Sequence, residues 1–181
     1  MKISRNTVIS FIIFVIVFIV YILTLCPSIY LGKSADHVLY ATGLSIIKPV
    51  SNPLWLFIAK LFKLFSPSDP AWGLNLMSAF FGAWTVSLLY IILANIGHDR
   101  TTEEITKFSK IPHLKQICAI SGSLLLAFCP IFWEASVIAG PNTLKSFMFV
   151  LSSLYIIKYL YLRKKRYMLF FSLILGIGIA N

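Results

Sequence analysis

Residues 7–25 read TVISFIIFVIVFIVYILTL, a run of nineteen residues without a single charge. As an α-helix rising about 1.5 Å per residue, this run would be about 28 Å long, close to the roughly 30 Å hydrocarbon core of a bilayer. Lys2 and Arg5 precede it. A cleaved signal peptide is the competing interpretation, but the apolar region of such a peptide usually has only about 7–15 residues. The run therefore predicts an uncleaved membrane-spanning helix.

The composition of the whole chain supports a membrane protein. Hydrophobic residues make up 59% of the 181 positions and charged residues 12%, whereas soluble domains contain about 45–50% apolar and about 25% charged residues. So few charges cannot cover a water-exposed surface. The formal net charge is +10, but the basic residues flank apolar runs instead of forming one patch. This distribution is typical of membrane topology signals and argues against nucleic acid as a partner.

Four further apolar runs follow the first. They predict membrane spans at residues 73–96, 116–133, 143–162 and 168–180. The predicted fold class is all-α: a polytopic helical membrane protein with about five transmembrane helices, plus short interfacial helices in the first external loop. Because the last run has only about 13 residues, we expect residues 1–181 to form a single transmembrane domain that is the N-terminal part of a longer protein.

The distribution of Lys and Arg predicts a cytoplasmic N-terminus. With that orientation, ten basic residues lie on the cytoplasmic side and five on the external side, as the positive-inside rule requires. We therefore expect a multi-pass protein of the cell inner (cytoplasmic) membrane, with residues 26–72 as an external loop. The five external basic residues would be Lys33, Lys48, Lys60, Lys63 and Lys145.

The loop at residues 26–72 contains two segments with helix signals. Ser34 can cap a helix that runs to about Ile47, and Asn52 followed by Pro53 is a favourable helix start. The second segment, PLWLFIAKLFKLF, has 13 residues. It is too short to cross a bilayer and suits a helix that lies in the interface.

Two of the few acidic residues fall at the membrane boundary on the predicted external face. Asp36 would lie in the first turn of the helix after Ser34, where the helix dipole favours a carboxylate, and Glu134 follows Phe-Trp at the outer end of the third span. Each could be functional, or could only stabilise a helix start or a membrane boundary. Tyr30, His37 and Tyr40 could line the same external cavity, although each residue type is also common in packing and in interfacial belts.

Basic residues near this face could bind a lipid phosphate, or could simply anchor the membrane boundary. They are Lys33, Lys48 and Lys145. The three cysteines have no metal-ligand spacing, and the chain has no phosphate-binding loop or zinc-protease motif. The sequence thus predicts no metal site and no cofactor.

Five segments carry a family resemblance, which covers residues 26–181. They are CPSIYLGKSADH (26–37), KPVSNPLW (48–55), WGLNLMSAFFGAW (72–84), FCPIFWEASVIAGPNTLKSF (128–147) and GIGIAN (176–181). In this order the segments resemble the N-terminal part of the bacterial protein-O-mannosyltransferase-like family known as domain of unknown function 2723. Members of that family look like GT-C membrane glycosyltransferases.

The resemblance implies sugar transfer where lipid meets water. An acidic residue of the first external loop would act as base on an acceptor hydroxyl of a protein or glycan, and the donor would be a polyprenyl-phosphate-linked sugar. On this basis Asp36 is the catalytic candidate. The substrate-binding candidates are Lys33, His37, Tyr40, Lys48, Glu134 and Lys145.

The chain differs from the family pattern at the loop itself. Lys33 stands where the loop Asp is expected, and Asp36 stands where the family has Glu. A lysine cannot replace a carboxylate as base unless its pKa falls by several units. Two hypotheses follow: a glycosyltransferase relative that uses Asp36, and a catalytically silent relative that binds a polyprenyl lipid or a partner membrane protein.

Overall fold

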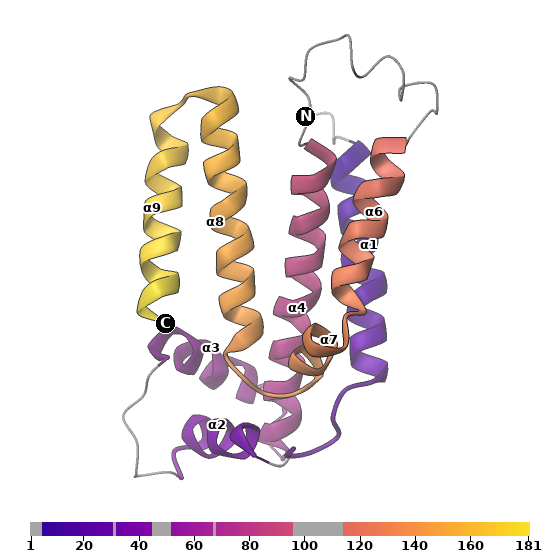
Figure 1. Ribbon diagram of the computed structural model, residues 1–181. Coiled ribbons are helices and arrows are strands. Elements are labelled where there is room, and N and C mark those ends of the chain that lie inside the picture. The colour runs from indigo at the N-terminus through magenta and orange to yellow at the C-terminus, as the bar shows by residue number, and fades with distance from the viewer. Residues whose placement is uncertain (1–4, 31, 45–51, 67, 96–113) are drawn as a thin grey trace.

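Long antiparallel helices form the body of the molecule (Figure 1). The computed structural model describes residues 5–30, 32–44, 52–66, 68–95 and 114–181. Among these, three helices are long and apolar enough to cross a membrane: α1 (Arg5–Leu23), α4 (Pro70–Asn95) and α8 (Asn142–Leu162). The prediction of a polytopic helical membrane protein is confirmed, and these helices match the first, second and fourth predicted spans.

The third predicted span is a broken one. It consists of α6 (Leu114–Ala127) and α7 (Pro130–Val137), which are bent by 62° relative to each other. Cys129 between them is extended, with φ −62° and ψ 125°. Proline lacks an N–H and disfavours helical backbone in the residue before it, so the helix breaks at this point. Counted as one span, the pair raises the number of candidate spans to four.

The fifth predicted span is a shorter helix, α9 (Lys165–Ala180), with 16 residues. It runs back beside α8 (Figure 1) and at about 1.5 Å per residue is about 24 Å long. Arg163 makes the turn between them in the left-handed conformation, with φ 52°. Within the described residues, three helices, or four if α6 and α7 form one span, are thus long enough to cross a membrane, and α9 is an additional shorter helix where an incomplete fifth run was expected.

Two short helices lie across one end of the bundle, as the sequence predicted. They are α2 (Lys33–Thr42) and α3 (Pro53–Lys63). This end, which we call the α2–α3 end, also holds α7, the start of α8 and the end of α9 (Figure 1).

The boundaries of α2 differ from the prediction. The helix is preceded by Gly32 at φ 91° and begins at Lys33, so Ser34 lies inside the first turn and does not cap it. It ends at Thr42 and not near Ile47, because Gly43 takes the left-handed conformation at φ 81° and terminates it. The prediction for α3 is confirmed at its start, with Asn52 in the N-cap position and Pro53 first.

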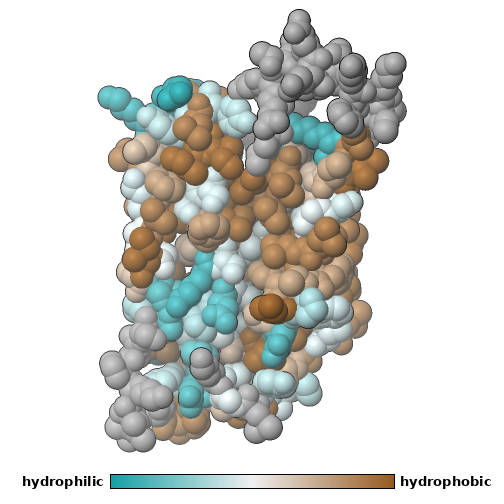
Figure 2. All heavy atoms as spheres, in the orientation of Figure 1, coloured by the Kyte–Doolittle hydropathy of each residue, from teal (hydrophilic) through white to brown (hydrophobic). Residues whose placement is uncertain are grey.

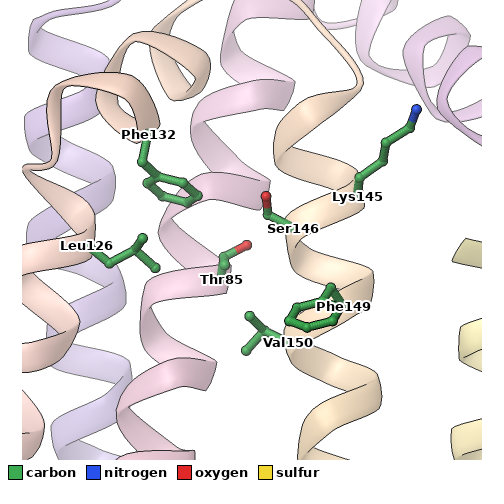
Figure 3. Close-up of a pocket in the computed structure, with 7 residues that line it drawn as sticks. All are labelled: Thr85, Leu126, Phe132, Lys145, Ser146, Phe149 and Val150. Atoms are coloured by element: carbon green, nitrogen blue, oxygen red, sulfur yellow. The ribbon is translucent and has the colours of Figure 1, made fainter.

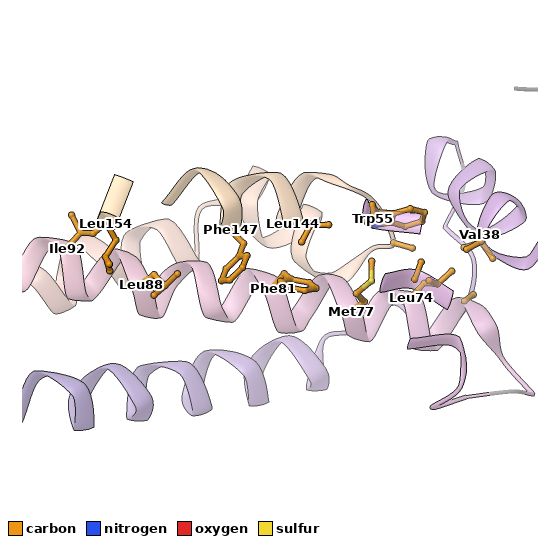
Figure 4. Packing of buried hydrophobic residues seen from close by; sticks show 14 residues of the cluster. Val38, Trp55, Leu74, Met77, Phe81, Leu88, Ile92, Leu144, Phe147 and Leu154 are labelled. Carbon is orange, nitrogen blue, oxygen red and sulfur yellow. The ribbon is translucent and has the colours of Figure 1, made fainter. Parts of the chain in front are cut away.

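Helix α4 forms the centre of the molecule and packs against α1, α3, α6, α7 and α8. Figure 4 shows the core between α4 and α8, where Phe81 and Leu88 of α4 lie near Phe147 and Leu154 of α8. A buried serine pair joins α1 to α4, since the hydroxyl groups of Ser10 and Ser87 lie 2.7 Å apart. Helices α1, α8 and α9 keep many large apolar side chains exposed, as lipid-facing helices do.

Candidate functional site

Trp55 joins three elements at the α2–α3 end. Its indole Nε1 donates a hydrogen bond to the carbonyl oxygen of Gly140 at 3.0 Å, just before α8 begins. Its ring centroid lies 5.3 Å from that of His37 on α2. Trp55 is almost fully buried, whereas His37 is half-buried. Trp55 therefore links α2 and the first turn of α3 to the segment that leads into α8.

Asn75 of α4 holds two loops beneath this contact. Its Nδ2 donates to the carbonyl oxygens of Cys26 at 2.8 Å and Ser28 at 3.2 Å, and its Oδ1 accepts from the Ala139 N–H at 2.7 Å. The sequence shows Asn75 only as a polar residue inside an apolar run. An amide within a predicted span is a signal for a structural or functional role, but its partners cannot be identified from the sequence.

The end of α9 caps α3. The Oδ1 atom of Asn181 accepts a hydrogen bond from the Trp55 N–H at 2.8 Å, which satisfies one of the free donors at a helix start. At this same end, three buried polar atoms lack a hydrogen-bond partner within the described ranges: Ser34 Oγ, Thr143 Oγ1 and Asn181 Nδ2. Each of these three atoms could form a further hydrogen bond. Leaving a buried polar group unpaired costs about 1–3 kcal/mol.

The catalytic candidate is exposed at the same end. Asp36 lies in the first turn of α2 with an exposed side chain. Tyr40 follows one turn later, on the same side of the helix, and is half-buried. Lys33 is the first residue of α2, and Lys48 lies outside the described residues. The structure thus brings Asp36, His37 and Tyr40 together on one short helix.

The remaining two candidates lie on other helices. Glu134 is exposed on α7, and Lys145 is exposed one turn into α8. No hydrogen bond or ion pair joins either of them to Asp36 in the described part of the chain. Their role as substrate-binding residues, which the family resemblance implied, therefore stays a prediction.

A cavity of about 410 Å³ opens beside Lys145. Figure 3 shows Lys145 at its edge, pointing outward, while Phe132 and Phe149 lie on opposite sides. Figure 2 shows a hydrophilic patch over the lower part of α8 on an otherwise largely hydrophobic face. The residues that line the cavity come from four helices: Thr85, Leu126, Phe132, Lys145, Ser146, Phe149 and Val150.

Metal ligands do not cluster in the residues that the structure places. No group of three or more His, Cys, Asp or Glu side chains among them could hold a metal ion. The described polar side chains at the α2–α3 end include a carboxylate, an imidazole, amides and hydroxyl groups.

These features define a multi-pass helical membrane protein with polar side chains gathered at one end of its bundle. Residues 34–181 match the family described as the Protein O-mannosyl-transferase TMEM260 N-terminal domain. The chain therefore belongs to this family, and its relation to mannosyltransferases agrees with the resemblance seen in the sequence. No curated protein and no solved structure matches it. The narrower assignment to the bacterial family stays a prediction.

Proposed function

We propose that this chain is the membrane domain of a glycosyltransferase that moves a sugar from a polyprenyl-phosphate donor to a hydroxyl group at the external face of the inner membrane. The acceptor would be a protein or a glycan. The observation that carries the proposal is Asp36, an exposed carboxylate on a short helix across the end of a membrane bundle, within the region that matches a protein O-mannosyltransferase family.

Asp36 has the chemistry of a general base. Its carboxylate takes the proton of the acceptor hydroxyl while that oxygen forms a bond to the anomeric carbon of the sugar. The bond between this carbon and the phosphate oxygen breaks, and the polyprenyl phosphate leaves with the electron pair. General-base catalysis of this kind contributes about 10²- to 10⁴-fold to a rate.

The surroundings of α2 support a fixed position for this base. Trp55 contacts His37, the residue next to Asp36, and is itself held by Gly140 and Asn181. A base held on a rigid element keeps its geometry towards the substrate, and small displacements of such groups reduce rates strongly.

One observation favours the second candidate function, a silent relative that binds a polyprenyl lipid or a partner membrane protein. Lys33 is the first residue of α2. It stands where the bacterial family that the sequence resembles has its loop aspartate. A cation at this position attracts phosphate but cannot accept a proton at neutral pH. If Asp36 does not replace the missing carboxylate, the site would retain binding and lose transfer.

The test is sugar transfer by the full-length protein in proteoliposomes that contain polyprenyl-phosphate mannose. Asp36→Asn should lower transfer by at least about 100-fold, whereas Asp36→Glu should keep most of it, because the bacterial family that the sequence resembles has Glu there. Transfer that Asp36→Asn leaves intact would remove Asp36 from the mechanism. Donor binding without transfer by the wild-type protein would instead establish the silent relative.

A further inference from the structure

The cavity beside Lys145 is a groove with apolar walls on α4, α6, α7 and α8. The break between α6 and α7, where the two helices are bent by 62°, lies at its wall, since Leu126 of α6 and Phe132 of α7 both line it. Phe149 is exposed and follows Lys145 by four residues, so the two side chains lie on one face of α8 at successive turns. At about 1.5 Å per residue, Phe149 lies about 6 Å deeper along the helix than Lys145.

A single positive charge stands at the edge of this groove. The Lys145 ammonium is exposed and forms no ion pair with any carboxylate that the structure places. Near the start of a membrane-spanning helix, a lysine keeps its charged group at headgroup depth while its aliphatic stem covers apolar surface. The groove and the charge together match the two parts of an anionic lipid, namely a hydrocarbon chain and a phosphate.

The groove offers little for a sugar. Apart from Lys145, its polar lining consists of Ser146 and Thr85, and the Thr85 hydroxyl already donates to the Phe81 carbonyl oxygen at 2.7 Å. Recognition of a sugar needs several placed hydrogen-bonding groups. These observations favour an ordinary membrane lipid over the sugar donor as the occupant.

We propose that this groove binds one acyl chain of an anionic glycerophospholipid, with the phosphate of the lipid held by the Lys145 ammonium. The site is separate from Asp36 and does not depend on the proposed sugar transfer. A lipid bound there would fill the space between α7 and α8, and would hold the broken span in its bent arrangement.

The experiment measures bound lipid on the full-length protein by native mass spectrometry. The protein is equilibrated in phosphatidylcholine nanodiscs that contain phosphatidylglycerol, and retained phosphatidylglycerol is counted. Lys145→Gln removes the charge, and Val150→Trp fills the groove. The matched controls are Lys158→Gln and Leu160→Trp, exposed positions at the far end of the same helix. Circular dichroism and gel filtration establish that each variant is folded.

We expect one retained phosphatidylglycerol on the wild-type protein and about fivefold weaker retention in Lys145→Gln, the loss of one lysine–lipid charge contact. Val150→Trp should abolish retention, and both control variants should retain the lipid as wild type does. Inorganic phosphate should not displace it. The proposal is overturned if no lipid is retained, if Lys158→Gln loses as much as Lys145→Gln, or if polyprenyl phosphate displaces phosphatidylglycerol at equal concentration.

Discussion

Replacing Asn75 with leucine should destabilise the protein strongly, because one buried amide holds two separate loops. The substitution keeps a similar volume but removes the bonds to Cys26, Ser28 and Ala139. Interhelical hydrogen bonds in membrane proteins average about 0.6 kcal/mol, whereas each buried group left unpaired costs about 1–3 kcal/mol. Three lost bonds and a stranded Ala139 N–H give an expected loss of about 3–5 kcal/mol.

The assay is reversible unfolding of the purified protein in micelles, with Asn95→Leu as the control. Asn95 lies at the far end of the same helix and is exposed, and its one hydrogen bond to another described residue is to the Ile91 carbonyl oxygen, so its loss should cost at most about 0.5 kcal/mol. A second readout is the reactivity of the Cys26 thiol, which should rise when its loop is released. Equal destabilisation by the two substitutions, with unchanged Cys26 reactivity, would refute the reasoning.

Two further predictions concern packing and orientation. A Cβ atom on Gly82 would lie 2.9 Å from the Ser136 Cβ atom, so Gly82→Ala should lower the free energy of unfolding by about 1–3 kcal/mol. A Cβ atom on Gly176 would meet no described atom within 4 Å, so Gly176→Ala should be neutral or stabilising in the same unfolding assay in micelles. An equal loss in both variants would contradict this view of the packing. The orientation can be tested with single cysteines in a background without natural cysteines. Ser68→Cys should react with an impermeant maleimide on intact cells, and Lys164→Cys should react only after permeabilisation. The opposite pattern would place the N-terminus outside.

The helices that cross the membrane could be predicted because their signal is local. The bounds of α1, α4 and α8 follow apolar runs whose length matches the bilayer. The break at Cys129-Pro130 was not predicted, although the third run contains this proline. Hydropathy alone could not predict the break, because the residues on both sides of the proline are equally apolar. A proline within an apolar run can either kink a continuous helix or end it.

The site was predicted less completely. The sequence singled out Asp36 and His37 from their position after the first span, and the structure places both on α2. It gave no role to Trp55 or Asn181, since their hydrogen bond joins positions 126 residues apart. The expected cap at Ser34 was wrong because Gly32 starts the helix earlier through a conformation that only glycine adopts easily.

The sequence by itself determined that the protein lies in a lipid bilayer, that its fold is helical, and approximately where each long helix lies. The reason is that lipid requires long apolar segments whose backbone groups are all paired within a helix. Only the tertiary structure decided which polar side chains meet at the α2–α3 end and where a groove opens beside Lys145. The physical reason is distance along the chain. Hydropathy acts residue by residue, whereas the contacts of Trp55, Asn75 and Asn181 exist only once helices remote in sequence have packed together.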